Sequence, residues 1–214
     1  MPVATPESPT ADRLSRRILI IACAALTREL RAVVGQMPEE IAASFDIKYL
    51  PAPLHNRPER IPDAVEQLLS ENIDRYARVV VAYADCGTGG LLDTVLGRYG
   101  VDRLPGAHCY EFFAGSAVFS ALHEAELGTF FLTDYLCRHF DSLVIGSLGI
   151  DRHPELRDQY FNNYVRVVLL SQSDDPEIIE AGRAAARRLG LAFEHRHVGM
   201  APFTAAIDTL VGAH

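Results

Sequence analysis

The chain has 214 residues, of which 49% are apolar, and this is enough to bury a sizeable hydrophobic core. Its formal charge of −8 argues against nucleic acid as a partner, because binding to phosphates requires clustered Lys and Arg side chains, and no such cluster is present in the sequence. The longest apolar run, residues 18–26, is less than half of the about 20 residues that a membrane-spanning helix needs, so we expect no membrane span.

The first sixteen residues are rich in proline and carry acidic side chains, which predicts a disordered tail over residues 1–16. Arg16 and Arg17 precede the apolar run, but the charged helical pattern behind that run is not typical of a signal peptide. The chain has only four cysteines and a sizeable core, which favours reduced thiols, ligands or nucleophiles over a disulfide scaffold. We therefore expect a cytoplasmic protein.

Short runs of β-branched residues alternate with longer amphipathic segments, the pattern of parallel strands joined by crossover helices. The predicted strands are residues 17–23, 45–50, 78–86, 101–106, 165–172 and 191–198. The predicted helices are residues 25–35, 62–76, 89–99, 110–124 and 174–190. The sequence therefore predicts one α/β domain over residues 17–214, with a three-layer, mostly parallel Rossmann-like sheet and helices on both faces.

The stretch from residue 129 to residue 164 has a helical pattern, in which the segment DSLVIGS is the one candidate strand. We interpret this stretch as a helical insertion or lid. Its end, GIDRHPELRDQYFNNY, is dense in polar and aromatic side chains that can cover a site from above. A capped surface helix is the equally weighted alternative. If the segment is a lid, the candidate substrate contacts are Arg152, His153 and Asn163.

Three cysteines fall where predicted strands end. Cys23 closes the first strand, Cys86 closes the third, and Cys109 follows the fourth at the start of a helix. His55 and His108 lie in the corresponding loops. Because the carboxyl ends of parallel strands form one edge, where ligands bind, we expect these side chains to share a rim. The three thiols, with His55, are the predicted metal ligands.

The local chemistry of this rim also favours reactive sulfur. A cysteine at a helix N-terminus tends toward the thiolate, the form that binds metals and attacks electrophiles, and this applies to Cys86 and Cys109. Gly87, Gly89 and Gly90 allow a tight turn and a close approach of the backbone to a cofactor. The run GTGG lacks both the dinucleotide fingerprint and the Walker lysine, so nucleotide binding is disfavoured.

Structural interpretations compete at each of these positions. Any one cysteine at a strand end can be a small buried hydrophobe, and this is the favoured interpretation of Cys137 in LTDYLCRHF. His55 can pack against the entry of the next helix. His108 and Cys109 are adjacent and point apart, so we favour Cys109 as the ligand and keep His108 as a substrate contact. Tyr110 is a second candidate substrate contact, although core packing is the default for an aromatic residue there.

Five segments of the sequence are distinctive when taken together: YADCGTGGLLD, GAHCYEFFAG, LHNRPERIP, FFLTDYL and GIDRHPELRDQYFNNY. With them the chain resembles, over Ile18 to about Leu210, a prokaryotic family classed as a domain of unknown function, number sixteen thirty-eight. The resemblance implies cysteines at the positions of Cys23, Cys86 and Cys109, and genes near corrinoid-dependent methylamine methyltransferases. This chain has Ala24 where the family usually has a glycine.

Three functional hypotheses follow. The leading one is a metal site of Cys23, Cys86 and Cys109, with an open position for water, a small-molecule substrate or His55, in methyl-group or one-carbon metabolism. Zinc is the favoured metal and a 4Fe-4S cluster is the alternative. The second is a metal-free enzyme with Cys86 as nucleophile, activated by the helix terminus and by His108 or His55. The third is an accessory module that binds a corrinoid protein, its cofactor or a methyltransferase through the helical insertion.

Overall fold

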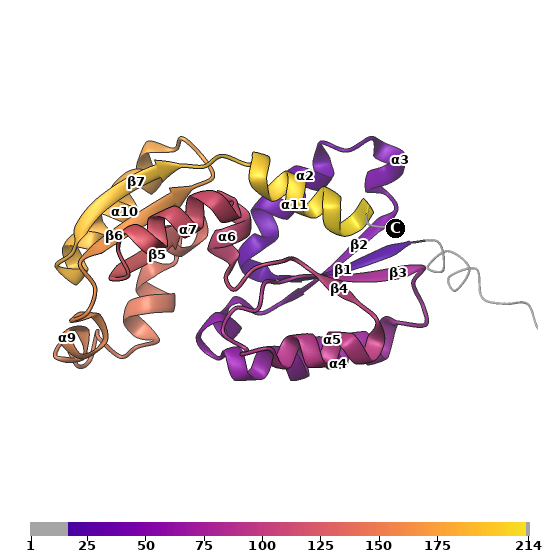
Figure 1. The fold of residues 1–214 in the computed structure, drawn as a ribbon, viewed down its shortest axis with the longest axis horizontal. Helices are drawn as coiled ribbons and strands as arrows, with labels where there is room; N and C mark the ends of the chain where they lie inside the picture. Colours follow the sequence, from indigo (N-terminus) through magenta and orange to yellow (C-terminus); the bar gives the residue numbers. More distant parts are fainter. Residues whose placement is uncertain (1–16, 213–214) are drawn as a thin grey trace, which may run out of the picture. The chain divides into compact units, whose positions relative to one another are not determined.

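A computed structural model describes residues 17–212, so the tail predicted over residues 1–16 lies outside the described part. The chain divides into two compact units. The first comprises Met1–Leu104 and Leu210–His214, and the second comprises Pro105–Thr209. The predicted α/β class with parallel strands is confirmed, with the strands shared between two sheets, as Figure 1 shows. No helix among the described residues is long and apolar enough to cross a membrane.

The first unit contains a four-stranded parallel sheet in the order β2-β1-β3-β4. The central strands pair along their length, with Ile20 beside Ile47 on one side and Val80 on the other. Both faces of β1 are buried, which explains its uninterrupted apolar sequence. The strands are β1 (Ile18–Cys23), β2 (Phe45–Leu50), β3 (Arg78–Ala82) and β4 (Asp102–Arg103).

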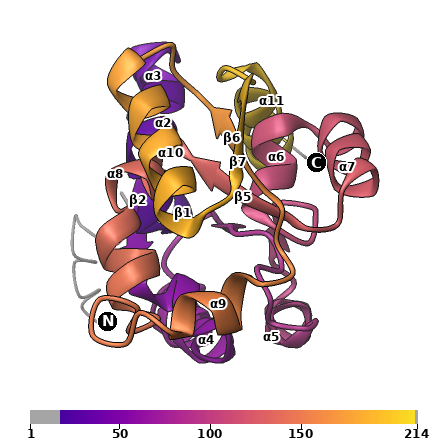
Figure 2. The ribbon, with the colours of Figure 1, turned by 90° about the vertical axis from the view of Figure 1, so that its left-hand side faces the viewer.

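Helices cover both faces of this sheet. The helical elements are η1 (Ala24–Leu26), α2 (Thr27–Gly35), α3 (Glu39–Ala42), η2 (Ala52–Asn56), η3 (Pro58–Arg60), α4 (Ile61–Asn72) and α5 (Leu91–Tyr99). The apolar sides of α4 and α5 share one core cluster with Leu19, Ile21, Val79 and Val81 of the sheet. Helix α2 lies on the opposite side of the sheet in Figures 1 and 2. The chain therefore changes face between the connections that follow β1 and β2, and this makes the boundary between β1 and β3 a topological switch point.

The second unit contains a three-stranded parallel sheet in the order β5-β6-β7. Its strands are β5 (Thr129–Thr133), β6 (Arg166–Ser171) and β7 (Ala192–His197). Its helices are α6 (Cys109–Ala114), α7 (Ser116–Ala125), α8 (Asp134–Arg138), the π-helix η4 (Asp141–Gly146), α9 (Leu156–Phe161), α10 (Pro176–Leu189) and α11 (Ala201–Gly212), the last turn of which belongs to the first unit. Helix α10 begins after Asp175, which accepts a hydrogen bond from the Glu177 amide, and ends at Gly190, as predicted.

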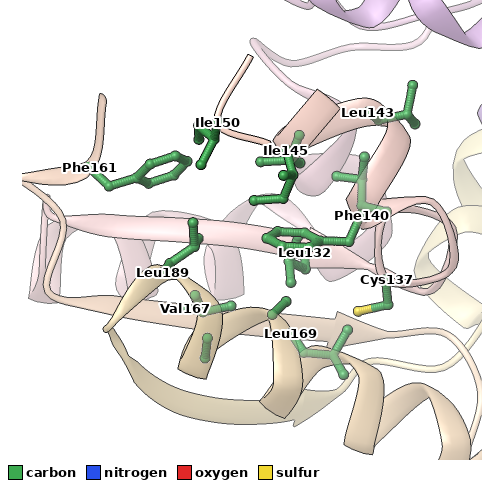
Figure 3. Close-up of a cluster of buried hydrophobic side chains, with 14 of the residues drawn as sticks. Leu132, Cys137, Phe140, Leu143, Ile145, Ile150, Phe161, Val167, Leu169 and Leu189 are labelled. Atoms are coloured by element: carbon green, nitrogen blue, oxygen red, sulfur yellow. The ribbon is translucent and has the colours of Figure 1, made fainter. Parts of the chain in front are cut away.

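The core of the second unit packs α8, η4 and α10 against one face of this sheet (Figure 3). Cys137 is 5% exposed within this cluster, beside apolar side chains such as Leu169, which confirms its structural interpretation. Helices α6 and α7 supply side chains to a smaller cluster with Phe131, Val168 and Leu170 on the other face. Each unit is therefore a sheet between two helical layers.

The prediction of a helical insertion over residues 129–164 is wrong at its start, because Thr129–Thr133 forms strand β5. Phe131 and Leu132 are consecutive and both buried, since both faces of the sheet are covered. A short run without polar alternation does not distinguish a buried strand from a buried helix. The candidate strand DSLVIGS instead contains the π-helix Asp141–Gly146. The single predicted domain over residues 17–214 corresponds to two compact units, because the two sheets have separate cores.

Candidate thiol site at the edge of the first sheet

The positions of the Cys23 and Tyr83 side chains follow from the two-residue period of side-chain direction in the adjacent strands β1 and β3. Alternate residues of β1 and β3 enter the same core cluster beneath α4 and α5, and Cys23 and Tyr83 continue that alternation at the carboxyl ends. Ala22 pairs with Ala82, so Cys23 and Tyr83 are the next opposed positions. The two side chains therefore lie side by side at the switch point of the sheet.

The Tyr83 hydroxyl is a buried polar group that lies close to the Cys23 thiol. The side chain is 3% exposed, and its oxygen has no hydrogen-bond partner of normal geometry among the described residues. Burial raises the pKa of Tyr83 well above its usual range, and the nearby sulfur groups of Cys23 and Cys86 raise it further. The hydroxyl therefore keeps its proton and can donate a hydrogen bond to a ligand.

Cys23 is a half-buried residue whose thiol lies deep in the fold. Burial raises the pKa of this thiol above its usual value. A hydrogen bond from the backbone of Ala25 lowers this pKa by a smaller amount. The Tyr83 hydroxyl lies close to the Cys23 thiol and also lowers the pKa, although the contact does not have normal hydrogen-bond geometry. Without a bound cation, Cys23 is therefore a neutral thiol at physiological pH.

Cys86 occupies an unusual backbone conformation. Its φ is +52°, and it is the one non-glycine residue with positive φ among residues 17–212. This conformation costs an L-residue about 1–2 kcal/mol. Gly87 follows with φ +85°, and a Cβ on Gly87 would come within 3.5 Å of Pro58, which follows β2. The strained turn after β3 therefore packs closely against the loop after β2.

A positive charge acts on Cys86. Arg103 in β4 forms a two-pronged ion pair with Asp93 in α5, with 2.9 Å between Nη2 and Oδ2. The hydrogen bond from Arg103 lowers the pKa of the Asp93 carboxyl, and Cys86 is among the groups that raise the pKa of Arg103. The sulfur of Cys86 therefore lies within electrostatic reach of the Arg103–Asp93 ion pair.

The loop of residues 85–90, here called the glycine loop, is held together by the carboxylate of Asp85. Asp85 accepts hydrogen bonds from Thr88 Oγ1 at 2.6 Å, the Gly90 amide at 2.9 Å and the Gly89 amide at 3.1 Å. Burial raises the pKa of Asp85, but these hydrogen bonds and Arg103 together lower it below its usual value. The amides of Gly89 and Gly90 are thus occupied by a negative charge, which disfavours a phosphate in this loop. Contact of Gly87, Gly89 and Gly90 with a cofactor stays a prediction.

The remaining predicted ligands lie in η2 and at the start of α6. His55 is exposed in η2, directly after β2, the neighbour of β1. Cys109 is half-buried and begins α6 of the second unit, and His108 precedes it. Among residues 17–212, no three His, Cys, Asp or Glu side chains are gathered closely enough to hold a metal ion. The complete predicted ligand set of Cys23, Cys86, Cys109 and His55 therefore stays a prediction.

The predicted substrate contacts lie in the second unit. Tyr110 packs against Phe119 and Phe131, with ring centroids 6.3 and 5.5 Å away, as core packing predicts. Arg152 and His153 are mostly exposed and approach Asp151 and Glu155 at 3.9 and 3.4 Å. Asn163 is also exposed. Tyr110 is thus part of a core cluster, and the other three residues lie on the surface. Contact of any of these residues with a substrate stays a prediction.

Sequence reasoning missed Tyr83 and Arg103. The alternation in RVVVAYADC contained a signal for Tyr83, because it continues the face of Val79 and Val81 beyond the end of β3. The sequence held no comparable signal for Arg103. Its approach to Cys86 depends on β4 pairing with β3, with Val81 beside Arg103.

These features define an α/β protein of parallel sheets with two sulfur side chains and a buried tyrosine hydroxyl at a switch point. The sequence model of the family described as "Protein of unknown function (DUF1638)" matches residues 49–207. The chain therefore belongs to this family, as the resemblance predicted. Cys86 and Cys109 lie within the matched region, and Cys23 lies before it. No curated protein matches the chain.

Proposed function

We propose that the chain binds a thiophilic metal through Cys23 and Cys86 and serves methyl-group or one-carbon metabolism. Zinc is favoured, and a 4Fe-4S cluster is the alternative. The supporting observation is that the buried hydroxyl of Tyr83, which has no hydrogen-bond partner of normal geometry among the described residues, lies close to the Cys23 thiol and within electrostatic reach of Cys86. Ligands of open parallel sheets bind outside the carboxyl ends of the strands at the switch point, which is where these three residues lie.

The donor chemistry fits a soft metal. Thiolates are preferred ligands of zinc and of iron–sulfur clusters. Cys23 must lose a proton before it can coordinate, so metal binding would release a proton and would strengthen as the pH rises. A bound zinc ion would supply Lewis-acid chemistry, holding a substrate thiol as its thiolate.

The protein groups around the sulfurs have separate tasks in this proposal. Tyr83 stays protonated and donates a hydrogen bond to a sulfur ligand or to a substrate atom. The loop held by Asp85 fixes the backbone on both sides of Cys86. A zinc site needs at least three protein ligands, and the sequence predicts Cys109 and His55 as the others. A corrinoid protein or methyltransferase is the partner that we propose from the family resemblance.

Metal analysis of the anaerobically purified full-length protein tests this function. We expect zinc or iron in stoichiometric amount, and visible absorption only if the metal is an iron–sulfur cluster. Cys23→Ser and Cys86→Ser should each lower metal occupancy at least about tenfold. Cys137→Ala is the matched control and should keep the metal, because Cys137 lies in the core of the second unit.

Further variants sharpen the result. Cys109→Ser and His55→Ala test the other predicted ligands, and an equal loss from Cys109→Ser would establish a three-cysteine site. Tyr83→Phe should keep the metal stoichiometry and weaken affinity about tenfold, as expected for an outer-shell hydrogen bond. Wild-type protein purified without metal that binds neither zinc nor iron would contradict the proposal.

A second candidate is a metal-free enzyme with Cys86 as nucleophile toward an acyl or alkyl substrate. Two observations favour it: the strained φ of +52° at a turn between strand and helix, and the nearby Arg103 charge. Under this alternative, iodoacetamide should alkylate Cys86 much faster than Cys23, and the rate should be the same in protein treated with a chelator. Under the metal proposal, bound metal should protect both cysteines.

A further inference from the structure

A surface pocket of about 380 Å³ lies in the second unit, lined by the end of α8, the start of η4 and one side of α10. This volume falls within the range of small-molecule sites, about 300–1,000 Å³. All of the lining residues belong to the second unit, so the pocket is separate from the cysteine site of the first unit. None of the site residues predicted from the sequence lines it.

The interior of the pocket is apolar. Ala181, Ala184 and Ala185 have the i, i+3, i+4 spacing that places them on one side of α10. Ala185 is 3% exposed, and Phe140, which is labelled in Figure 3, is 6% exposed. The pocket therefore extends from solvent to buried apolar groups, which can hold the apolar part of a ligand.

The wall opposite α10 contains a break in helical geometry. Helix α8 is followed by His139, whose φ is −113° and ψ is 19°, and the chain continues as the π-helix η4 from Asp141. His139, Asp141 and Ser142 all line the pocket. Because π-helical turns are rare and occur frequently at functional sites, this geometry favours a functional interpretation of the pocket.

The rim of the pocket carries an excess of positive charge. Arg188 forms an ion pair with Asp141, and both residues line the pocket. Arg138 also lines it, and its guanidinium approaches the Asp175 carboxylate at 3.8 Å, which is too long for a hydrogen bond. The lining therefore contains one guanidinium that no other lining residue neutralises, in a chain whose formal charge is −8.

We propose that this pocket binds a small organic carboxylate, with its apolar body against Phe140 and the alanines of α10 and its carboxylate on Arg138. The planar guanidinium of arginine matches a carboxylate through two parallel hydrogen bonds. One positive charge in excess matches a monoanion. A phosphate monoester carries about 1.5–2 negative charges at pH 7, so the charge balance of the pocket favours a carboxylate.

Calorimetric titration of the full-length protein with sodium benzoate tests the ligand class. Benzamide has the same ring without the charge, and acetate has the charge without the ring. We expect benzoate to bind at least about tenfold more tightly than either compound, because the apolar interior and Arg138 both contribute. Inorganic phosphate should bind more weakly than benzoate. No detectable binding of benzoate, equal binding of benzamide, or tighter binding of phosphate would overturn the proposal.

Two substitutions locate the binding event. Arg138→Gln should weaken benzoate binding about tenfold or more, and Arg187→Gln is the matched control. Arg187 is 62% exposed on α10, is paired with Glu180 and lies outside the pocket. Ala184→Leu should also weaken binding, because Ala184 is exposed and a larger side chain there fills the pocket without altering the core. Equal losses in Arg138→Gln and Arg187→Gln would overturn the proposal, since the anion would then respond only to the total charge.

A third substitution gives a gain that unfolding cannot mimic. Asp141→Asn should strengthen benzoate binding, because the Arg188 guanidinium then loses its ion-pair partner and is available to the ligand. Unchanged or weaker binding in Asp141→Asn would contradict the placement of the carboxylate at this rim.

The cysteine variants separate this inference from the proposed function. Cys23→Ser should bind benzoate as wild type does, and Arg138→Gln should keep the metal content of wild type. Loss of benzoate binding in Cys23→Ser would overturn the inference while supporting the cysteine site, because the carboxylate would then be bound by the cysteine-held metal.

Discussion

Two buried polar side chains, one at the carboxyl end of each sheet, differ in how well the protein satisfies them. Asp134, after β5, is 2% exposed and accepts hydrogen bonds from the Gln172 and Ser173 amides, both at 3.1 Å, and from the Ser173 hydroxyl. Tyr83, after β3, is 3% exposed and its hydroxyl has no partner of normal geometry among the described residues. The same degree of burial therefore accompanies three hydrogen bonds for Asp134, and only a poorly aligned contact with the Cys23 thiol for Tyr83.

This difference separates a structural role from a functional one. The hydrogen bonds of Asp134 join the start of α8 to the loop after β6, so its charge stabilises the second unit. An unpartnered buried hydroxyl lowers stability by about 1–3 kcal/mol, and native proteins rarely keep one without a reason. A ligand that accepts its hydrogen bond is the reason that we propose for Tyr83, because two sulfur groups lie beside it.

The largest expected effect on stability comes from removing the carboxylate of Asp134, whose hydrogen bonds are satisfied. Asp134→Ala should lower the free energy of unfolding by about 2–4 kcal/mol, because the amides of Gln172 and Ser173 lose their acceptor in a buried environment. Urea denaturation followed by circular dichroism measures this change. Asp141→Ala is the matched control, since Asp141 is 80% exposed, and it should change stability by about 0.5 kcal/mol or less. Equal effects of the two substitutions would contradict a structural role for Asp134.

The sequence predicts those elements of the fold in which successive residues have regularly repeating surroundings. The strands β1, β3 and β6 follow from β-branched runs, and the start and end of α10 follow from Asp175 and Gly190. Strand β5 escapes prediction because five residues buried on both faces have neither a helical nor a strand period. The local sequence pattern therefore suffices to predict an element whose residues have regular surroundings. It fails to predict a short element that is buried on all sides.

Prediction of the candidate site depends more strongly than prediction of the fold on pairing between residues that are distant in the sequence. Cys23 is predictable because it ends β1, and Cys86 because it lies in the turn that follows β3, and parallel strands end at one edge. The partners that give these sulfurs their chemistry depend on register, which brings Tyr83 beside Cys23 and Arg103 near Cys86.

A smaller effect is expected from the strained backbone beside the unsatisfied hydroxyl. Cys86→Gly should be more stable than Cys86→Ala by about 1 kcal/mol, because glycine adopts φ +52° without the steric cost that alanine retains. The comparison of two variants removes the contribution of the sulfur, which both lack. Thermal denaturation of both variants measures the difference. Greater stability of Cys86→Ala would show that the left-handed turn relaxes when the thiol is removed.

The smallest expected effect concerns the pH dependence contributed by Asp85. The pKa of Asp85 is lowered in the folded protein, so its ionised form stabilises the fold above the ordinary aspartate value near 3.9. That stabilisation should disappear as the pH falls through the lower pKa of the folded state. Asp85→Asn should therefore be about 1 kcal/mol less stable than wild type at pH 7, and the gap should close toward pH 2.

Urea denaturation of wild type, Asp85→Asn and the control Asp208→Asn at several pH values measures this gap. Asp208 is exposed on α11, so its variant should follow wild type throughout. A gap between Asp85→Asn and wild type that is constant from pH 7 to pH 2 would mean that the charge of Asp85 contributes nothing. The amides of Gly89 and Gly90 would then be held by shape alone, and a negative charge on Asp85 would not be what keeps phosphate out of the glycine loop.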